Sequence, residues 1–227
     1  MTQSIKVSVD AVVFGYTPED GVSVLLIKRK NEPFKHSWAL PGGLVRNDEA
    51  LEDAVRRELK EEAGIDVQFM EQLYSFGMPD RDPRNRVISI AYYALVRPRD
   101  FQLSAQTDAE DVEWYSVTEV PKLAFDHKNI LDYAIKRLRG KLAYEPIGFE
   151  LLDKKFPFSD LERLYQSLLL QQIDRRNFKK KIMAYGFLEE LAEYIQRGAG
   201  RPARLYQFNK KKYFELKKNG YNFDLFL

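Results

Sequence analysis

The stretch GGLVRNDEALEDAVRRELKEEAGI, residues 42–65, is dense in carboxylates and has glycine at its start and near its end. Acidic side chains fill what would be the first turn of a helix, which Asn47 or Asp48 can cap and Gly64 can close. The spacing therefore predicts an amphipathic helix. Its apolar positions form one stripe that can pack on a sheet: Leu51, Val55 and Leu59.

Three carboxylates share one face of this predicted helix. Glu58, Glu61 and Glu62 stand at positions i, i+3 and i+4, so they lie side by side. Each like-charged pair costs an isolated helix ~0.2–0.5 kcal/mol, which a hard divalent cation would offset. Mg²⁺ is the expected ion, with Mn²⁺ as the alternative, and Arg57 and the Gly43 carbonyl can complete the site. A solvated acidic face is the plainer interpretation.

The joint spacing of these residues is more specific than any one of them. Gly43 is followed after five residues by Glu49, and after seven more by RELKEEAGI, which begins at Arg57. This pattern resembles a complete Nudix box. The resemblance implies an α/β/α sandwich, metal bound by Glu58, Glu61 and Glu62, and substrates in which a nucleoside diphosphate is linked to another group. In an active enzyme, Arg57, Glu61 and Glu62 would take part in catalysis.

A catalytic base usually lies outside such a box, and three residues are candidates. Glu110 and Asp111 follow or begin a predicted strand, and His127 opens a predicted helix. Any of them could activate water for attack at phosphorus. A lone histidine is more often structural than catalytic, so the base stays open among the three.

The loop MPDRDPRNR, residues 78–86, is a candidate phosphate-binding segment. Arg81, Arg84 and Arg86 carry guanidinium forks that match phosphate oxygens. The loop resembles that of the ADP-ribose-directed branch of the Nudix family, which implies an effector or substrate similar to ADP-ribose. The alternative is a charged loop exposed to solvent.

Strand and helix patterns alternate through the first two thirds of the chain. β-prone runs and one further amphipathic helix surround residues 42–65, which predicts one mixed α/β domain over residues 1–145. The predicted strands cover residues 5–16, 22–30, 87–96 and 112–117, and the second helix covers residues 125–142.

The remaining residues, 146–227, predict a winged helix domain. A short strand or an entry segment at 148–152 precedes a helix at 158–169, which Ser159 and Glu162 could open as a capping box. A second helix runs from a cap at Asp174 to Gly186, two strand-like runs follow at 187–196 and 203–208, and residues 210–220 predict a terminal helix. Helix, turn, helix and hairpin is the winged-helix order.

The charge of the chain is divided between these two parts. Residues 1–150 hold 20 basic and 25 acidic residues, a net of −5, whereas residues 151–227 hold 16 and 9, a net of +7. A basic face on a second helix and a basic hairpin tip are typical of DNA binding. The candidate DNA-binding residues are Arg175, Arg176, Lys179 and Lys180 on the helix, and Arg197, Arg201 and Arg204 on the hairpin.

The tail motifs DRRNF (174–178) and GRPARLY (200–206) resemble the Nudix-related transcriptional regulators of bacteria. That resemblance implies a homodimer on a double-stranded DNA operator, and an effector that is a nucleotide sugar or a pathway sugar and that weakens DNA binding. The alternative is a Mg²⁺-dependent pyrophosphohydrolase acting on ADP-ribose or another nucleoside diphosphate sugar. A scaffold that uses neither activity is a third interpretation.

Composition agrees with an intracellular protein. The chain has no cysteine, which excludes disulfides and fits a reducing compartment. The N-terminus lacks the pattern of a signal peptide, and no apolar run approaches the ~18 residues of a membrane span. We therefore expect a cytoplasmic location with no membrane partner.

Overall fold

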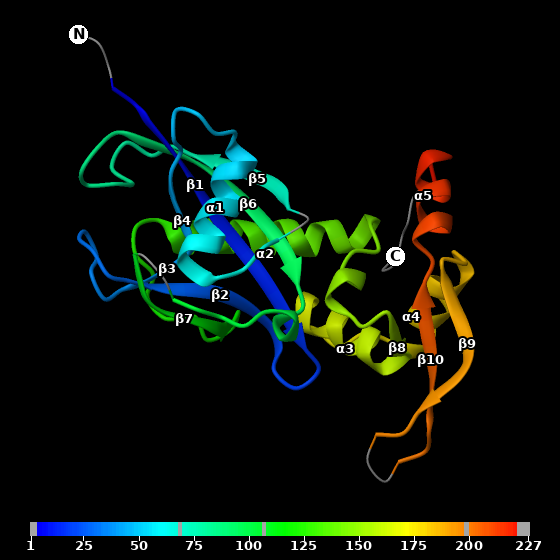
Figure 1. The fold of residues 1–227 in the computed structure, drawn as a ribbon. Coiled ribbons are helices and arrows are strands. Elements are labelled where there is room, and N and C mark those ends of the chain that lie inside the picture. The colour runs from blue at the N-terminus through cyan, green and yellow to red at the C-terminus, as the bar shows by residue number, and fades with distance from the viewer. Residues whose placement is uncertain (1–3, 68–69, 106–107, 198–199, 222–227) are drawn as a thin grey trace. The chain divides into compact units, whose positions relative to one another are not determined.

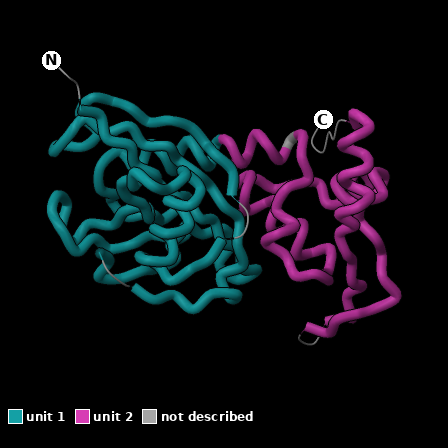
Figure 2. The backbone as a smooth tube through the Cα atoms, turned by 45° about the horizontal axis from the view of Figure 1, so that its top comes forward, with its two compact units in different colours: residues 1–136 teal, residues 137–227 magenta. Residues whose placement is uncertain are grey.

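A computed structural model describes residues 4–67, 70–105, 108–197 and 200–221 (Figure 1). The chain divides into two compact units, residues 1–136 and 137–227 (Figure 2). The division falls inside helix α2 (His127–Tyr144), earlier than the boundary at 145/146 drawn from the sequence. Among the described residues, none of the helices has the length and apolar character needed to cross a bilayer.

The first unit is built on a seven-stranded mixed sheet, and one 3-10 turn, η1 (Pro98–Asp100), follows β6. The strands run in the order β3-β2-β1-β6-β5, while β4 pairs with β1 and β7 pairs with β2. The central pair β1–β6 is parallel and the other pairs are antiparallel. The bounds are β1 Lys6–Thr17, β2 Gly21–Arg29, β3 Trp38–Ala39, β4 Gly42–Leu44, β5 Glu71–Phe76, β6 Val87–Val96 and β7 Ala109–Ser116.

The valine-rich sequence of β1 explains its central place. Successive side chains of a strand point to opposite faces, and both faces of β1 are buried from Ser8 onward. Val9 and Val13 join a core cluster with helix α1 (Leu51–Ala63). In Figure 1, α1 lies in front of the sheet and α2 behind it, which is the predicted mixed α/β arrangement.

The helix predicted over residues 47–64 is confirmed, but the predicted cap at Asn47 or Asp48 is wrong. The helix begins at Leu51 with Ala50 at the N-cap, and no side chain caps it. The acidic side chain that precedes the helix is used elsewhere, because Glu49 accepts from the Arg46 backbone N–H at 2.8 Å. The predicted close is confirmed: Gly64 adopts φ 71°, a left-handed conformation that glycine adopts without strain.

The second unit has the predicted order of helix, helix and hairpin. Its three-stranded antiparallel sheet runs β8-β10-β9. Residues 148–152, predicted as a short strand or an entry segment, form a 3-10 turn and no strand. The bounds are η2 Phe149–Leu151, β8 Lys155–Pro157, α3 Phe158–Leu169, α4 Arg175–Ala184, β9 Leu188–Ile195, β10 Ala203–Phe208 and α5 Lys210–Lys218.

Aromatic rings fill the core of the second unit. Phe149 and Phe208 stack with ring centres 4.0 Å apart, and Tyr165 packs against Phe178 at 5.0 Å. These contacts join the 3-10 turn to β10 and α3 to α4, so they fix the hairpin and both helices.

The predicted caps of the two helices have different outcomes. Asp174 caps α4 as predicted and accepts from the Asn177 backbone N–H at 2.9 Å. Ser159 does not cap α3, which begins at Phe158. Pro157 ends β8, where it pairs with Leu205, and the chain turns directly from that strand into the helix.

Candidate functional site

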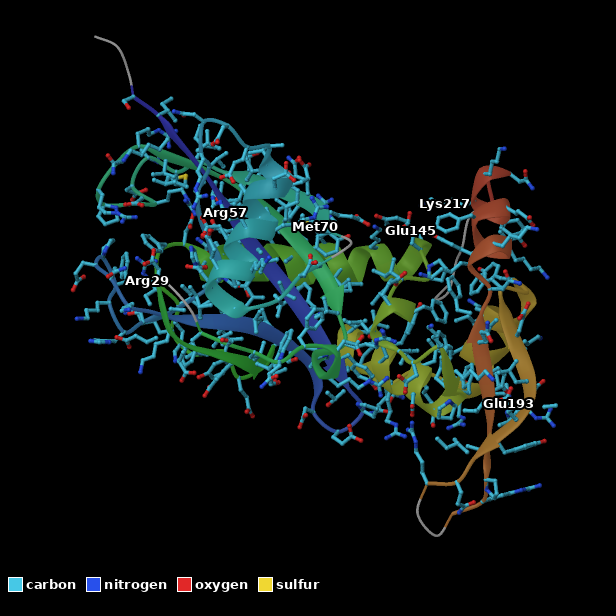
Figure 3. All side chains as sticks on the ribbon, viewed as in Figure 1. Arg29, Arg57, Met70, Glu145, Glu193 and Lys217 are labelled. Atoms are coloured by element: carbon cyan, nitrogen blue, oxygen red, sulfur yellow. The ribbon has the colours of Figure 1, made fainter. Side chains whose placement is uncertain are left out.

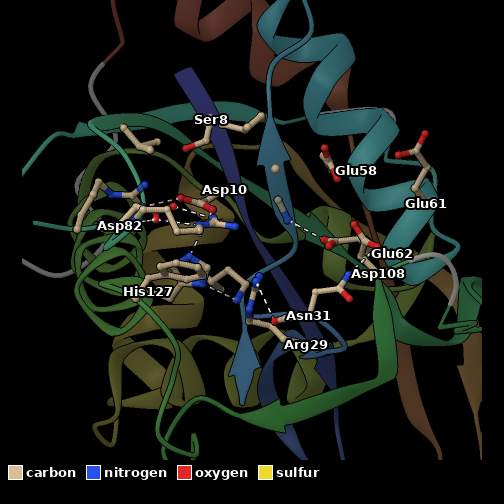
Figure 4. A pocket seen from close by; sticks show the side chains of 18 of the residues that line it. Ser8, Asp10, Arg29, Asn31, Glu58, Glu61, Glu62, Asp82, Asp108 and His127 are labelled. Atoms are coloured by element: carbon tan, nitrogen blue, oxygen red, sulfur yellow. Dashed lines mark hydrogen bonds and ion pairs between the residues drawn. The ribbon is translucent and has the colours of Figure 1, made fainter. Parts of the chain in front are cut away.

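A cleft of about 540 Å³ opens in the first unit and is the main candidate site (Figure 4). Strands β1, β2 and β4, helix α1 and the loop that contains Arg81 and Arg84 supply its lining. Glu58, Glu61 and Glu62 all line it, so the structure brings the three predicted carboxylates to one cavity.

Arg57 organises the acidic side of the cleft. Its guanidinium donates to Glu49 at 2.6 and 2.8 Å, to Glu58 at 2.6 Å and to Glu61 at 3.1 Å. A fifth hydrogen bond reaches the Leu44 carbonyl of β4 at 3.2 Å. The guanidinium holds the pKa of Glu49 at about 2, so this carboxylate stays ionised. Arg57 thus balances several like charges that would otherwise repel (Figure 3).

Glu62 has a different environment from its two neighbours. Only 5% of the residue is exposed, and its carboxylate accepts from the Gly42 backbone N–H at 2.8 Å. Burial raises the pKa of Glu62 to about 8. The backbone at Gly43 also lies close to a carboxylate of α1, since a Cβ on Gly43 would lie 2.3 Å from Glu58 Oε1.

The chemistry of these donors fits a hard divalent cation. Carboxylates and a nearby backbone carbonyl, such as that of Gly43, are the oxygen ligands that Mg²⁺ prefers. Within the described part of the chain, however, no three acidic or histidine side chains already converge as a ligand group. An ion in the cleft would compete with Arg57 for the carboxylate of Glu58.

Arg81, a predicted effector-binding residue, is the centre of a buried ion-pair group. Its guanidinium donates to Asp126 at 2.7 and 3.0 Å and to Asp10 at 3.1 Å. Ser89 also donates to Asp10, at 2.5 Å. Arg81 lines the cleft and is 8% exposed, so it fixes one wall and has little surface left for a ligand.

His127, a candidate base, also lines the cleft and is buried. Its Nδ1 accepts from the Leu40 backbone N–H at 2.9 Å, which places the proton on Nε2, 3.5 Å from Asp10 Oδ1. Burial lowers the pKa of His127, so the ring is neutral. Both nitrogens are thereby engaged, and this arrangement positions the ring without a lone pair for a substrate.

The other two candidate bases lie outside the cleft lining. Glu110 pairs with His36 at 2.8 Å, and that contact lowers the pKa of Glu110. Asp111 is exposed on β7 and accepts from the Val112 backbone N–H at 2.8 Å. The described residues therefore bring neither carboxylate to the box carboxylates in this structure.

Two arginines at one aromatic ring are the cationic side of the cleft. Arg29 was missed by the sequence analysis; its guanidinium lies 4.9 Å from the centre of the Phe125 ring, and that of Arg84 lies 5.9 Å from it. Arg84 also pairs with Asp82 at 2.8 Å. Burial and the charge of Arg84 lower the pKa of Arg29, which indicates that an anion is favourable there. In the sequence, the one feature that could have identified Arg29 as a site residue is its position near the end of the predicted strand 22–30.

Two other side chains complete the description of the cleft. Arg86, the third predicted arginine, contacts the carbonyls of Met78 and Val87 at 3.4 and 3.3 Å and does not line the cleft. Ser8, on β1, does line it, and its buried Oγ is the one buried side-chain polar atom in the described residues without a hydrogen-bond partner. A buried hydroxyl facing a cavity indicates a polar ligand.

In the second unit, the predicted DNA-binding residues of α4 line a shallow hollow. Arg175, Arg176, Lys179 and Lys180 all belong to it. Arg175 pairs with Glu162 of α3 at 2.8 Å, and Lys179 donates to the Tyr206 hydroxyl at 2.8 Å. Arg176 and Lys180 are exposed, and among the ion pairs of the described chain neither takes part.

The hairpin arginines are also held by acids of their own unit. Arg197 pairs with the buried Asp160 at 2.9 Å, and Arg204 pairs with Glu190 at 3.0 Å. Arg201 is exposed beside the hairpin tip, whose residues 198–199 lie outside the described residues. Three of the five predicted DNA-binding arginines of the unit thus already have a carboxylate partner.

Comparison with curated proteins finds relatives of both parts. The ADPR responsive transcriptional repressor NtrR of Acinetobacter baylyi is 33% identical over 210 residues, 91% of this chain and 83% of the relative. The ADP-ribose pyrophosphatase of Methanocaldococcus jannaschii is 44% identical over 128 residues, 56% of this chain and 72% of the relative.

Solved structures show the same two-part architecture. Shewanella oneidensis NrtR complexed with a 27mer DNA aligns with a TM-score of 0.76 at 29% identity, covering 96% of this chain and 97% of that one. The Nudix domain of the same protein complexed with ADP ribose aligns with a TM-score of 0.55 at 35% identity, covering 60% of this chain and 90% of that one.

Family profiles agree with these alignments. The NUDIX domain profile matches residues 6–134, and the profile of the NrtR DNA-binding winged helix domain matches residues 148–208. The chain therefore belongs to the Nudix family, in the group that joins a Nudix domain to an NrtR-type winged helix domain.

Proposed function

We propose that the protein is a bacterial transcriptional repressor that binds operator DNA through its winged helix and senses an ADP-ribose-like nucleotide in the Nudix cleft. The observation that carries this proposal is the joining of an NrtR-type winged helix to a cleft that combines acidic and cationic walls. Both relatives with this architecture bear on it, one named as ADPR-responsive and one solved with DNA.

The cleft offers both cationic groups and metal-binding carboxylates to the diphosphate of a nucleotide sugar. Arg29 and Arg84 can bind phosphate oxygens through their guanidinium forks. Mg²⁺, with Mn²⁺ as the alternative, would be held by the box carboxylates and would neutralise the diphosphate charge. Ser8 would supply a hydroxyl to the same ligand.

Release of DNA follows from linkage. An effector that binds the DNA-free form more tightly shifts the population away from DNA by the ratio of its two affinities. A ratio of about 100 needs a coupling free energy of ~2.7 kcal/mol. We propose a homodimer on a palindromic operator in the cytoplasm, because a closed twofold dimer matches a twofold DNA site.

A gel-shift assay tests this proposal. The probe is a labelled duplex from the region upstream of the protein's own gene, with ADP-ribose, NAD or a pentose added in the presence of Mg²⁺. We expect ADP-ribose to release the duplex. Arg176→Ala should weaken binding and lower the salt slope by about 1, while Arg99→Ala in the first unit should not. If the wild-type protein does not prefer this duplex over a random one, the proposal that it is a transcriptional regulator is rejected.

A second candidate function is hydrolysis of ADP-ribose, with the tail as an accessory domain. It is favoured by the complete box and by 44% identity to an ADP-ribose pyrophosphatase. Nudix hydrolases in general use divalent metal ions. The test measures AMP released from ADP-ribose with and without Mg²⁺. Turnover that is lost in Glu61→Gln would support an enzyme, and no turnover at micromolar protein would leave the cleft as a sensor.

A further inference from the structure

Helix α5 follows the hairpin and lies beyond the winged-helix profile, which ends at residue 208. Its sequence, KKKYFELKK, holds five lysines and one glutamate. Its formal excess of four positive charges on nine residues approaches that of α4, which has five on ten, so the helix is a candidate surface for a polyanion.

The helix is firmly attached to the core of the second unit. Asn209 caps it by accepting from the Lys212 backbone N–H at 2.9 Å, and the Asn209 N–H donates to the Phe187 carbonyl at 2.7 Å. Tyr213 is 9% exposed and its ring lies 5.6 Å from that of Phe208 and 6.1 Å from that of Phe187. The lysines are therefore presented from a fixed frame.

Most of these lysines differ from the arginines of the winged helix in having no carboxylate partner. Lys217 pairs with Glu145 at 2.7 Å. Lys210, Lys211 and Lys218 are exposed, and the ion pairs found among the described residues include none of them. A cation without an internal partner gains the full benefit of a phosphate contact, whereas Arg197 must first leave Asp160.

The first turn of α5 lies against the end of α4. A Cβ on Gly186, in the turn that ends α4, would be 2.7 Å from Lys212 Nζ. Figure 1 shows α5, α4 and the β9–β10 hairpin gathered within the second unit. The start of α5 therefore adjoins the turn that ends the basic helix α4.

We propose that α5 is an additional DNA-binding element, which contacts backbone phosphates beside the segment that α4 occupies and does so without regard to sequence. This inference rests on the proposed function, since it needs the winged helix on DNA. Lysine acts on phosphate as a point charge and carries no base-pair information, so α5 adds affinity without adding specificity.

An anionic membrane surface could also attract the lysines of α5, but the structure favours DNA. A helix that lies on a bilayer presents a broad apolar face to the lipid. In α5 the buried ring of Tyr213 faces its own core, and Phe214, 61% exposed, is the large apolar side chain directed to solvent. One exposed ring is too little apolar surface for a lipid-binding helix.

The test compares two triple variants of the full-length protein. Lys210→Gln/Lys211→Gln/Lys218→Gln removes the unpaired charges of α5. The control, Lys6→Gln/Lys122→Gln/Lys136→Gln, removes three exposed lysines of the first unit. Both triples change the formal net charge from +2 to −1, so any difference reports position and not charge. Thermal unfolding of each variant checks that the fold is kept.

Binding is titrated by fluorescence anisotropy at several salt concentrations, with the upstream duplex and with a random-sequence duplex of equal length. We expect the α5 variant to bind both duplexes about 10-fold more weakly at low salt and to lose ~2–3 from the salt slope per chain, with the ratio between duplexes unchanged. The control triple should leave both slopes in place.

Three outcomes would overturn the proposal. Equal behaviour of the two triples shows that α5 does not touch DNA, and a changed ratio between duplexes shows base readout instead of phosphate contact. Loss of binding to phosphatidylglycerol vesicles with intact DNA binding assigns α5 to a membrane. The random duplex separates this test from the proposed function, because α5 can be scored on it even if the upstream duplex is not preferred.

Discussion

The two units use opposite charges in the same way. In the Nudix unit, carboxylates line the cleft and one arginine, Arg57, holds three of them. In the winged-helix unit, arginines form the surface and single carboxylates such as Asp160 hold them. In each unit the commoner charge, which we call the majority charge, lines the candidate binding surface. The opposite charge, which we call the minority charge, holds those side chains in position. Substituting Arg57 or Asp160, the oppositely charged residue of each unit, should therefore disturb the local structure more than substituting one of the many residues of the commoner charge.

Arg57→Ala is expected to have the largest effect, because it tests the minority charge of the Nudix unit. The substitution leaves Glu49, Glu58 and Glu61 without their common partner. We expect a loss of about 3 kcal/mol in the free energy of unfolding, because breaking a largely buried ion pair leaves uncompensated charge. In thermal unfolding this corresponds to a fall of ~6–12 °C in Tm of the Nudix unit.

The neighbouring arginine supplies the control. Arg56 is 43% exposed and pairs with Asp53 at 3.6 Å, so Arg56→Ala should change the free energy of unfolding by less than ~0.5 kcal/mol. Similar losses in both variants would show that helix charge in general, and not the grip of Arg57 on the carboxylates, stabilises the unit.

Arg29→Ala tests whether the cationic side of the cleft binds the effector. A charge-assisted hydrogen bond contributes ~1.5–3 kcal/mol, so the Kd for ADP-ribose should rise by a factor of about 10 to 100, measured by isothermal titration calorimetry. Lys28→Ala is the matched control, because Lys28 is next in the strand and does not line the cleft. An unchanged Kd would show that the acidic wall alone binds the nucleotide.

Asp160→Asn tests the minority charge of the winged-helix unit. Asp160 pairs with Arg197 at 2.9 Å and with Arg163 at 3.4 Å. The freed arginines should add one or two phosphate contacts per chain and steepen the salt slope on a random duplex by ~0.9–1.8. Glu193→Gln is the control, since it also removes one negative charge but releases Lys155, paired at 2.7 Å, instead (Figure 3). A weaker affinity in Asp160→Asn would mean that the carboxylate orients Arg197 for DNA instead of competing with it.

Ser8→Ala should have the smallest effect and the clearest sign. The Oγ has no partner in the described structure, so removing it should leave the free energy of unfolding unchanged or slightly higher. Loss of one hydrogen bond to the nucleotide, ~0.5–1.5 kcal/mol, should raise the Kd for ADP-ribose about 2- to 10-fold. Ser23→Ala, another buried serine of this sheet outside the cleft, should leave that Kd unchanged. A loss of stability in Ser8→Ala would show that its hydroxyl is already satisfied.

Local signals predicted much of the fold. The cap at Asp174, the close at Gly64 and the two strands predicted at 187–196 and 203–208 depend on a few adjacent residues, and all are confirmed. Strand β5 was not predicted, because Leu73 is the one fully buried residue among its six. Strands β3, β4 and β8 were not predicted either, since two or three residues are too few for a periodic pattern. Their positions come from pairing with β2, β1 and β10, which only the folded chain provides.

The candidate site shows the same limit. The box carboxylates were predicted to share a face because helix geometry fixes positions three and four apart, and all three line the cleft. The surroundings of Arg81 were not predictable, since its partners Asp10 and Asp126 are 71 and 45 residues away in sequence. Arg29 was missed for a related reason: what distinguishes it is the ring of Phe125, nearly a hundred residues later.

The two glycines at the start of the box set the positional tolerance of the cleft. A Cβ at residue 42 would lie 2.2 Å from the Val9 carbonyl oxygen, and one at residue 43 would lie 2.3 Å from Glu58 Oε1. The first distance shows how closely β4 approaches the backbone of β1. The second shows how closely a side chain of α1 approaches β4. No side-chain rotation can relieve the first contact, so residue 42 has no room for a methyl group and β4 keeps its place beside β1. The second contact is with a side-chain oxygen, so a side chain at residue 43 would force Glu58 to rotate out of its present position.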